Sequence, residues 1–248
     1  MRPGVLKRAL VVVGCGALAV TASACESTES ESAKIAREGG PAAAGPSALK
    51  LGAANHGVRA SDVTLLSSGG RTAVAVKLTA SSPRAQSNVP LLVNVTGAGG
   101  KVLYTNGTGG VEASLQRIAL LRPHVGEWWV DDQVLTAQPG RAVSVHVGTG
   151  KSVRSRAAKP TLTAKVRHVG EQSGLSALSG ELVNGSSTAQ SKVPVFAVAL
   201  RGGKVVAAGR AVVGSLAGRR GASAPFQIFL VGNPAGAKFE LTAVPAAA

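Results

Sequence analysis

The sequence predicts an all-β fold with two tandem β-sandwich domains, residues 49–150 and 161–248, and three observations support it. Short runs such as "TAVAVKLTA" and "AVSVHV" alternate small or apolar residues with polar ones, as half-buried strands do. Gly, Ser, Asn and Pro interrupt these runs roughly every eight to twelve residues. Two long passages of the chain also repeat each other. With about six or seven short strands in each unit, the expected architecture is an immunoglobulin-like sandwich.

The repeat is visible in two short motifs that recur in the same order. Ala-Gln-Ser-x-Val-Pro occurs at residues 85–90 and again at 189–194, and Gly-Gly-Lys-Val occurs at 99–102 and 202–205. Solenoid units repeat every ~20–50 residues, so a spacing of about a hundred residues favours two duplicated domains instead.

Residues 1–24 have the composition of a secretory signal peptide. Arg2, Lys7 and Arg8 precede the apolar run "ALVVVGCGALAV" (residues 9–20), and no acidic residue occurs before Glu26. The run is shorter than the ~20 apolar residues that span a bilayer. We therefore expect export and cleavage of this segment, not a transmembrane helix.

The stretch Ala22-Ser23-Ala24-Cys25 resembles the lipobox of bacterial lipoproteins. The resemblance implies that the Cys25 thiol receives a diacylglyceryl group and that the chain is cut just before it. The small residues at 22–24 would also suit ordinary signal peptidase. Cys15 follows a similar tripeptide, but too few apolar residues precede it. Two acyl chains anchor a protein stably, so we expect the mature protein at the outer face of the cytoplasmic membrane.

Residues 25–48 form the predicted tether between the lipid and the folded region. The segment "ESTESESAKIAREGGPAAAGPSA" (residues 26–48) contains four Glu and two basic residues, with Gly, Pro and Ala behind them. A segment with so few large apolar groups has little surface to bury, and this favours a disordered tether.

The folded region is strongly basic. From Leu49 onward the chain has 22 Lys and Arg against 8 acidic residues, a net charge near +14. Such an excess favours polyanionic partners: phospholipid head groups, teichoic-type polymers or acidic proteins. A simpler alternative is that the charge only keeps the protein soluble near an anionic surface. Aromatic residues are too few for base stacking, and we expect no nucleic-acid binding.

A basic linker, residues 151–160, joins the two predicted sandwiches. The second unit resembles the FxLYD-type domain of bacterial envelope lipoproteins in "SGELVNGSS" (179–187), "GGKVVAAG" (202–209) and "APFQIFL" (224–230). The resemblance implies a small extracytoplasmic β-sandwich and no catalytic residues.

No pattern in the sequence predicts a catalytic, cofactor-binding or metal-binding site. "GTGKS" (148–152) resembles the end of a phosphate-binding loop, but Val145 stands where the motif requires glycine. If the chain is cut before Cys25, the mature protein keeps no free thiol. The four histidines are far apart and lack the spacing of metal ligands: His56, His124, His146 and His168. We therefore expect a protein without enzymatic activity.

The segment "RPHVGEWWVDDQV" (122–134) contains both tryptophans. If it is a strand, Trp128 and Val130 lie on one face, and Glu127, Trp129 and Asp131 lie on the other. We expect Trp128 in the core, at the place that Phe226 takes in the second unit, and Trp129 at the surface with the two acids. A calcium site there would need more converging oxygens.

Two functions are compatible with these observations. The first is a lipid-anchored envelope protein without catalytic activity that engages an anionic envelope polymer or a protein partner. The alternative is a carbohydrate-binding module in which an exposed Trp129 stacks on a sugar and Glu127 and Asp131 flank it.

Overall fold

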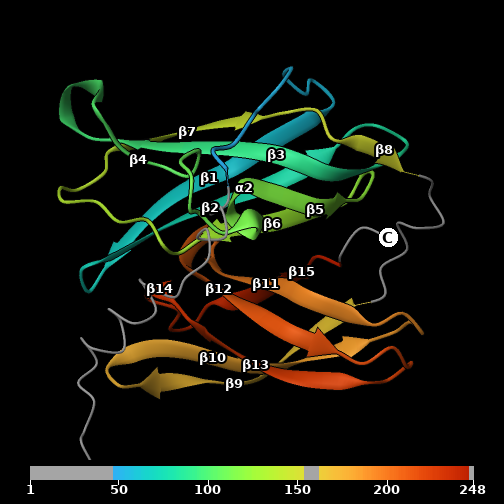
Figure 1. Ribbon diagram of the computed structural model, residues 1–248. Coiled ribbons are helices and arrows are strands. Elements are labelled where there is room, and N and C mark those ends of the chain that lie inside the picture. The colour runs from blue at the N-terminus through green and yellow to red at the C-terminus, as the bar shows by residue number, and fades with distance from the viewer. Residues whose placement is uncertain (1–46, 154–161, 246–248) are drawn as a thin grey trace, which may run out of the picture. The chain divides into compact units, whose positions relative to one another are not determined.

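The computed structural model describes residues 47–153 and 162–245, which we call the N-terminal half and the C-terminal half. The predicted all-β fold is confirmed: nearly all regular structure is antiparallel strand (Figure 1). The predicted signal peptide, Cys25, most of the predicted tether and residues 154–160 of the predicted linker lie outside the described residues.

The N-terminal half contains eight strands and two short helices. Strand β8 occupies the first three residues of the predicted linker. The elements are β1 (Val58–Ser68), β2 (Arg71–Ala80), β3 (Ala85–Thr96), η1 (Ala98–Gly100), β4 (Val102–Thr105), α2 (Ala113–Gln116), β5 (Arg117–Leu121), β6 (Gly126–Asp131), β7 (Ala142–Val147) and β8 (Lys151–Val153).

The C-terminal half contains seven strands. They are β9 (Leu162–Gln172), β10 (Leu175–Asn184), β11 (Gln190–Arg201), β12 (Lys204–Leu216), β13 (Ser223–Phe229), β14 (Val231–Gly232) and β15 (Lys238–Ala243).

The two halves share one strand arrangement. The sheet β1-β2-β6 corresponds to β9-β10-β13, and β4-β3-β7 corresponds to β12-β11-β15. The register agrees as well: Val76 pairs with Trp129 as Gly180 pairs with Phe226, and Leu91 pairs with Val147 as Val195 pairs with Ala243. The sequence repeat is therefore also a repeat of topology. It shows that Trp129, not Trp128, takes the place of Phe226.

The halves pack against each other through unlike sheets. The sheet β1-β2-β6 of the N-terminal half contacts β14-β12-β11-β15 of the C-terminal half, so four sheets lie in succession (Figure 1). Each of these two middle sheets has a neighbouring sheet on both of its faces.

This double burial explains the continuous apolar runs in the sequence. Residues Val193–Ala199 of β11 are all buried. Val195 and Ala197 face the interior of the C-terminal half, whereas Phe196 and Val198 join a hydrophobic cluster that includes Trp128 and Val130. Strands covered on both faces lose the polar alternation of half-buried strands. The contact between the halves is thus built as a hydrophobic core.

Candidate functional site

Strand β6 carries all three residues for which a ligand contact was predicted. The alternation is as expected, with Trp128 on one face and Trp129 on the other. Both faces are covered, however: residues 127–131 are all buried. The face of Glu127, Trp129 and Asp131 lies over the interior of the N-terminal half, and the face of Trp128 meets the C-terminal half.

The predicted exposure of Trp129 is wrong. Its side chain is among the largest that are fully buried, with 1% of its surface exposed. The indole Nε1–H donates to the carbonyl of Ser114, 3.1 Å away, in the short helix α2. Sequence alternation predicts on which face of a strand a residue lies, but not whether another part of the protein covers that face. Here the indole of Trp129, which was expected to be exposed, is buried and hydrogen-bonded.

Glu127 and Asp131 are also buried, at 4% and 0% exposure. Glu127 forms an ion pair with Arg122, and its Oε2 has no hydrogen-bond partner. Asp131 accepts a 2.5 Å hydrogen bond from the Tyr104 hydroxyl and one from the Gln133 amide. Burial raises the pKa of both carboxyl groups, and their hydrogen-bond partners offset this only in part. Burial and the Asp131 carboxylate likewise raise the pKa of Tyr104.

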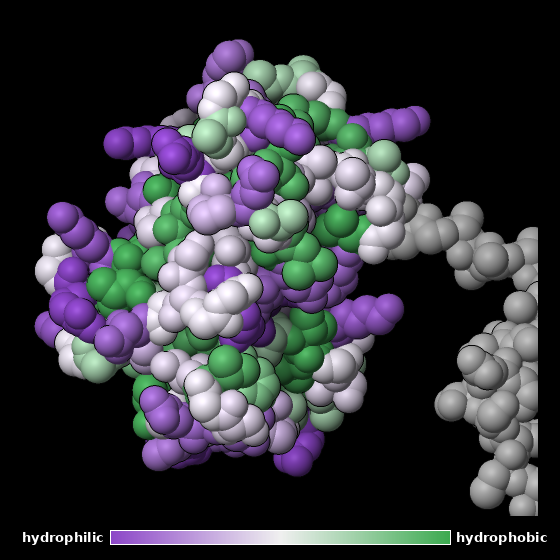
Figure 2. Space-filling view, turned by 90° about the vertical axis from the view of Figure 1, so that its left-hand side faces the viewer, coloured by the Kyte–Doolittle hydropathy of each residue, from purple (hydrophilic) through white to green (hydrophobic). Residues whose placement is uncertain are grey.

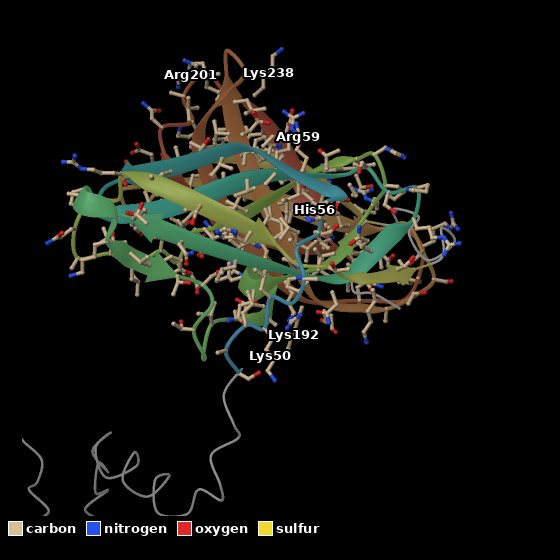
Figure 3. The ribbon with its side chains drawn as sticks, turned by 90° about the horizontal axis from the view of Figure 1, so that it is seen from above. Lys50, His56, Arg59, Lys192, Arg201 and Lys238 are labelled. Carbon is tan, nitrogen blue, oxygen red and sulfur yellow. The ribbon has the colours of Figure 1, made fainter. Side chains whose placement is uncertain are left out.

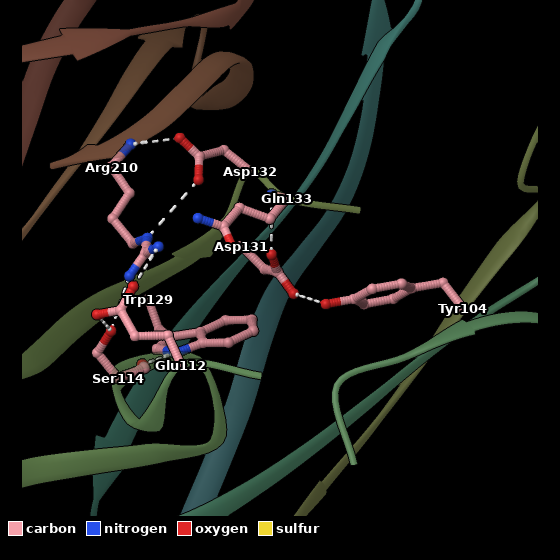
Figure 4. A network of polar contacts seen from close by, with 8 residues as sticks. All are labelled: Tyr104, Glu112, Ser114, Trp129, Asp131, Asp132, Gln133 and Arg210. Carbon is pink, nitrogen blue, oxygen red and sulfur yellow. Dashed lines mark hydrogen bonds and ion pairs between the residues drawn. The ribbon is translucent and has the colours of Figure 1, made fainter. Parts of the chain in front are cut away.

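Arg210 forms the centre of a polar network between the halves (Figure 4). It projects from β12, and its guanidinium donates to Ser114 Oγ at 2.7 Å and to Glu112 Oε2 at 2.9 Å. Asp132 lies 3.6 Å from its Nε and also accepts from its backbone amide at 3.2 Å. The side chain of Arg210 is 4% exposed, so two carboxylates compensate a buried charge.

The carboxylates of this network respond differently to Arg210. Burial raises the pKa of Asp132, and the nearby guanidinium of Arg210 lowers it only in part. For Glu112 burial acts in the same direction, but hydrogen bonds from Arg210 and Ser114 outweigh it and lower the pKa.

Trp128 provides a second polar contact between the halves. Its backbone amide donates to Thr242 Oγ1 at 3.0 Å, and its indole N–H donates to Glu240 Oε2 at 2.6 Å. Lys77 lies over the indole ring, 5.1 Å from its centroid, and also pairs with Glu240 at 3.4 Å. The contact uses side chains of β2, β6 and β15.

The groups around Arg210 and Trp128 join the two halves, whereas Tyr104 and Asp131 pair within the N-terminal half. Perturbed pKa values also arise in structural ion-pair networks such as these. Within the described part of the chain, no three His, Cys, Asp or Glu side chains converge as metal ligands would. No helix in these residues has both the length and the apolar character that a membrane crossing requires.

Most acidic residues in the described part of the chain have partners within the protein. The described residues contain 19 Lys and Arg and 8 Asp and Glu. Five of the acids form ion pairs, and Asp131 is buried against Tyr104. Among the described residues, only Asp62 and Glu171 remain outside ion pairs and exposed, while only four of the cations are paired.

The unpaired cations are distributed around the molecule. Figure 3 shows Arg201 and Lys238 along one edge, Lys50 and Lys192 along the opposite edge, and Arg59 between them. On the face in Figure 2, hydrophobic residues form separate small patches surrounded by hydrophilic ones. The outward surface is therefore basic on several sides and has no large apolar patch in this view.

Arg210 was missed by the sequence reading. The only signal was one arginine inside the apolar run "KVVAAGRAVVGSL" (204–216), at a position that alternation would also allow at the surface. Its four partner atoms come from segments about eighty to a hundred residues away, which no local pattern reveals.

Comparison with known proteins gives no family assignment. No protein-family model matches the chain, and no curated protein matches it in sequence.

Proposed function

We propose that the protein is a lipid-anchored, non-catalytic protein of the bacterial envelope that holds an anionic polymer or surface at the outer face of the cytoplasmic membrane. The observation that carries the proposal is the charge imbalance of the surface. Five of the eight described acids form ion pairs within the protein and Asp131 is buried against Tyr104, while fifteen of nineteen cations have no ion-pair partner among the described residues. A basic surface attracts polyanions through its summed field.

The anchoring part of the proposal depends on Cys25 and the preceding signal sequence. Intact-mass measurement of the membrane-extracted protein is expected to show a chain that begins at Cys25 and carries lipid. Cys25→Ala should release the protein from the membrane fraction, because two acyl chains are lost. An equally membrane-bound Cys25→Ala variant would overturn the anchor.

The binding part can be tested separately with the Cys25→Ala chain, so that acyl chains do not contribute. Beads carrying polyglycerol phosphate should retain it at low salt and release it as the NaCl concentration rises, because salt screens exposed charges beyond about 10 Å at 0.1 M. Beads carrying neutral dextran are the control. Retention that is indifferent to salt, or equal on both beads, would contradict the proposal.

The carbohydrate-binding alternative required an exposed Trp129 that could stack on a sugar. Trp129 and both flanking acids are buried and hydrogen-bonded or ion-paired within the protein. We therefore retain only the charge-driven function.

A further inference from the structure

A polar cleft of about 400 Å³ lies at the end of the N-terminal half where β1 begins and β2 ends. Its lining is almost free of apolar side chains. The residues are Arg59, Ser61, Asp62, Thr79, Ala80, Ser81 and His124. It shares no residue with the network around Arg210.

The backbone at the cleft has two unusual positions. Asp62 has φ +50° and lies at the register shift between β1 and β2, and His124 has φ +58°. The Asp62 carbonyl accepts from Thr64 Oγ1, and the His124 amide donates to the Ala80 carbonyl at 2.8 Å. Left-handed non-glycine residues and β-bulges are costly or irregular and often direct side chains toward a binding site. Two of them line this one cleft.

The cleft presents groups of opposite charge that do not pair with each other. Arg59 and Asp62 are both exposed, and neither forms an ion pair among the described residues. Among the described residues, only Ser61 donates a hydrogen bond to the Asp62 carboxylate, at 3.3 Å, which leaves most of its acceptor capacity available. Arg59 lies across the strand pair from Thr79, whose hydroxyl adds a neutral donor.

This set of groups matches a ligand that is an anion at one point and a hydroxyl donor at another. A guanidinium binds a phosphate through two parallel hydrogen bonds, and a carboxylate accepts hydrogen bonds from alcohols. We propose that the cleft binds a phosphate ester of a polyol, with the phosphate on Arg59 beside His124 and a free hydroxyl on Asp62.

This inference rests on the proposed function and specifies its ligand chemistry. A polyol phosphate with free hydroxyls occurs in two possible sources: a polymer chain and the head group of phosphatidylglycerol. The shared chemistry is glycerol phosphate, so the test uses a soluble fragment of it and then separates the sources.

The test measures binding of glycerophosphoglycerol and of inorganic phosphate to the full chain in detergent, by isothermal titration calorimetry. Arg59→Ala should weaken glycerophosphoglycerol binding at least tenfold, the usual effect of removing a charge-assisted bidentate contact. Asp62→Asn, which keeps a residue tolerated at positive φ, should weaken glycerophosphoglycerol several-fold and leave phosphate unchanged or tighter. Lys101→Ala, an exposed cation in the β3–β4 turn, is the matched control and should change neither by more than twofold.

Unchanged glycerophosphoglycerol binding in Arg59→Ala would overturn the proposal that the cleft is the binding site. An equal loss of affinity for both probes in Asp62→Asn would overturn it as well. Salt-dependent retention on polyglycerol phosphate beads that persists in Arg59→Ala would leave the proposed function intact and reject only this site. If these measurements support the cleft, two further assays identify the source of the ligand. Arg59-dependent retention on the beads indicates the polymer, and Arg59-dependent binding of the Cys25→Ala chain to phosphatidylglycerol vesicles indicates the lipid.

Discussion

Whether a single residue is buried depends on partners that are distant in the sequence, and the local sequence pattern does not reveal them. Trp129 was expected at the surface because it shares a strand face with Glu127 and Asp131, and acidic neighbours usually indicate solvent. The structure buries all three, since Tyr104, Gln133 and Arg122 compensate the two carboxyl groups. A local pattern could not predict these partners.

At this scale the strongest prediction concerns Arg210→Ala. The change leaves Asp132, whose side chain is 12% exposed, beside the contact without its cation. Removing one member of a buried ion pair destabilises a protein by roughly 3 kcal/mol, and the loss should appear as a lower urea midpoint. Arg167→Ala is the control, because its pair with Glu181 is exposed and solvent screening should leave the urea midpoint nearly unchanged.

The effect of Arg210→Ala should depend on pH in a defined direction. Arg210 lowers the pKa of Asp132 and Glu112, so its removal raises both in the folded state. A carboxyl group with a raised folded pKa loses stability as pH rises from its unfolded pKa, near 4, through the folded value. The difference in unfolding free energy between variant and wild type should be larger at pH 7.5 than at pH 4.5. A difference that is constant with pH would show that lost packing, not charge, is responsible.

At the scale of elements, strand existence was predictable and strand burial was not. The alternating run "AVSVHV" became β7, whose residues alternate between exposed and half-buried. The alternating run "TAVAVKLTA" of β2 and the apolar run "VPVFAVAL" of β11 also indicated strands. Only contact with a second sheet on each face explains why residues 73–76 and 193–199 are buried without interruption.

Strand β12 offers a matched pair of glycines to test this packing. A Cβ at Gly209 would lie 2.5 Å from the Phe229 carbonyl oxygen and 2.6 Å from Ile228 Cγ2, whereas a Cβ at Gly214 would meet nothing within 4 Å. Gly209→Ala should therefore destabilise the protein by about 1–3 kcal/mol through overpacking. Gly214→Ala should be neutral or stabilising by up to about 1 kcal/mol, because alanine restricts the unfolded chain. Thermal unfolding followed by circular dichroism measures both, and equal shifts for the two variants would refute the close approach.

At the scale of the whole molecule, equivalent positions of the two repeated halves differ in polarity according to whether they lie in the contact between the halves. Val198 and Asn94 occupy equivalent positions, as do Val130 and Gln227. The apolar member of each pair lies in the contact between the halves, and the polar member lies on the corresponding outer sheet. A head-to-tail contact between repeated units could in principle continue into a chain of molecules, and polar residues on both outer sheets oppose that.

The repeat itself was predictable, whereas the contact between its copies was not. Motif spacing indicated two units, but nothing in it told which sheet of one unit would cover the other. That information lies in differences between the copies, such as Val198 against Asn94, and these become meaningful only when the strands are aligned in space.

Unfolding should follow this coupling. Because Phe196, Val198 and Trp128 belong to one hydrophobic cluster that includes both halves, we expect a single calorimetric transition for the folded region. Val198→Asp places a charge in the contact and leaves the interior of the C-terminal half intact, since Val195 and Ala197 on the opposite face form that core. It should separate unfolding into two transitions.

Val212→Asp, at a β12 position that is 38% exposed, should keep one transition near the wild-type temperature. The milder Val198→Ala should keep one transition at a lower temperature, because it loosens the contact without charging it. Two transitions in the wild type would mean that the halves fold independently. One unshifted transition in Val198→Asp would mean that the hydrophobic contact at Val198 does not couple them.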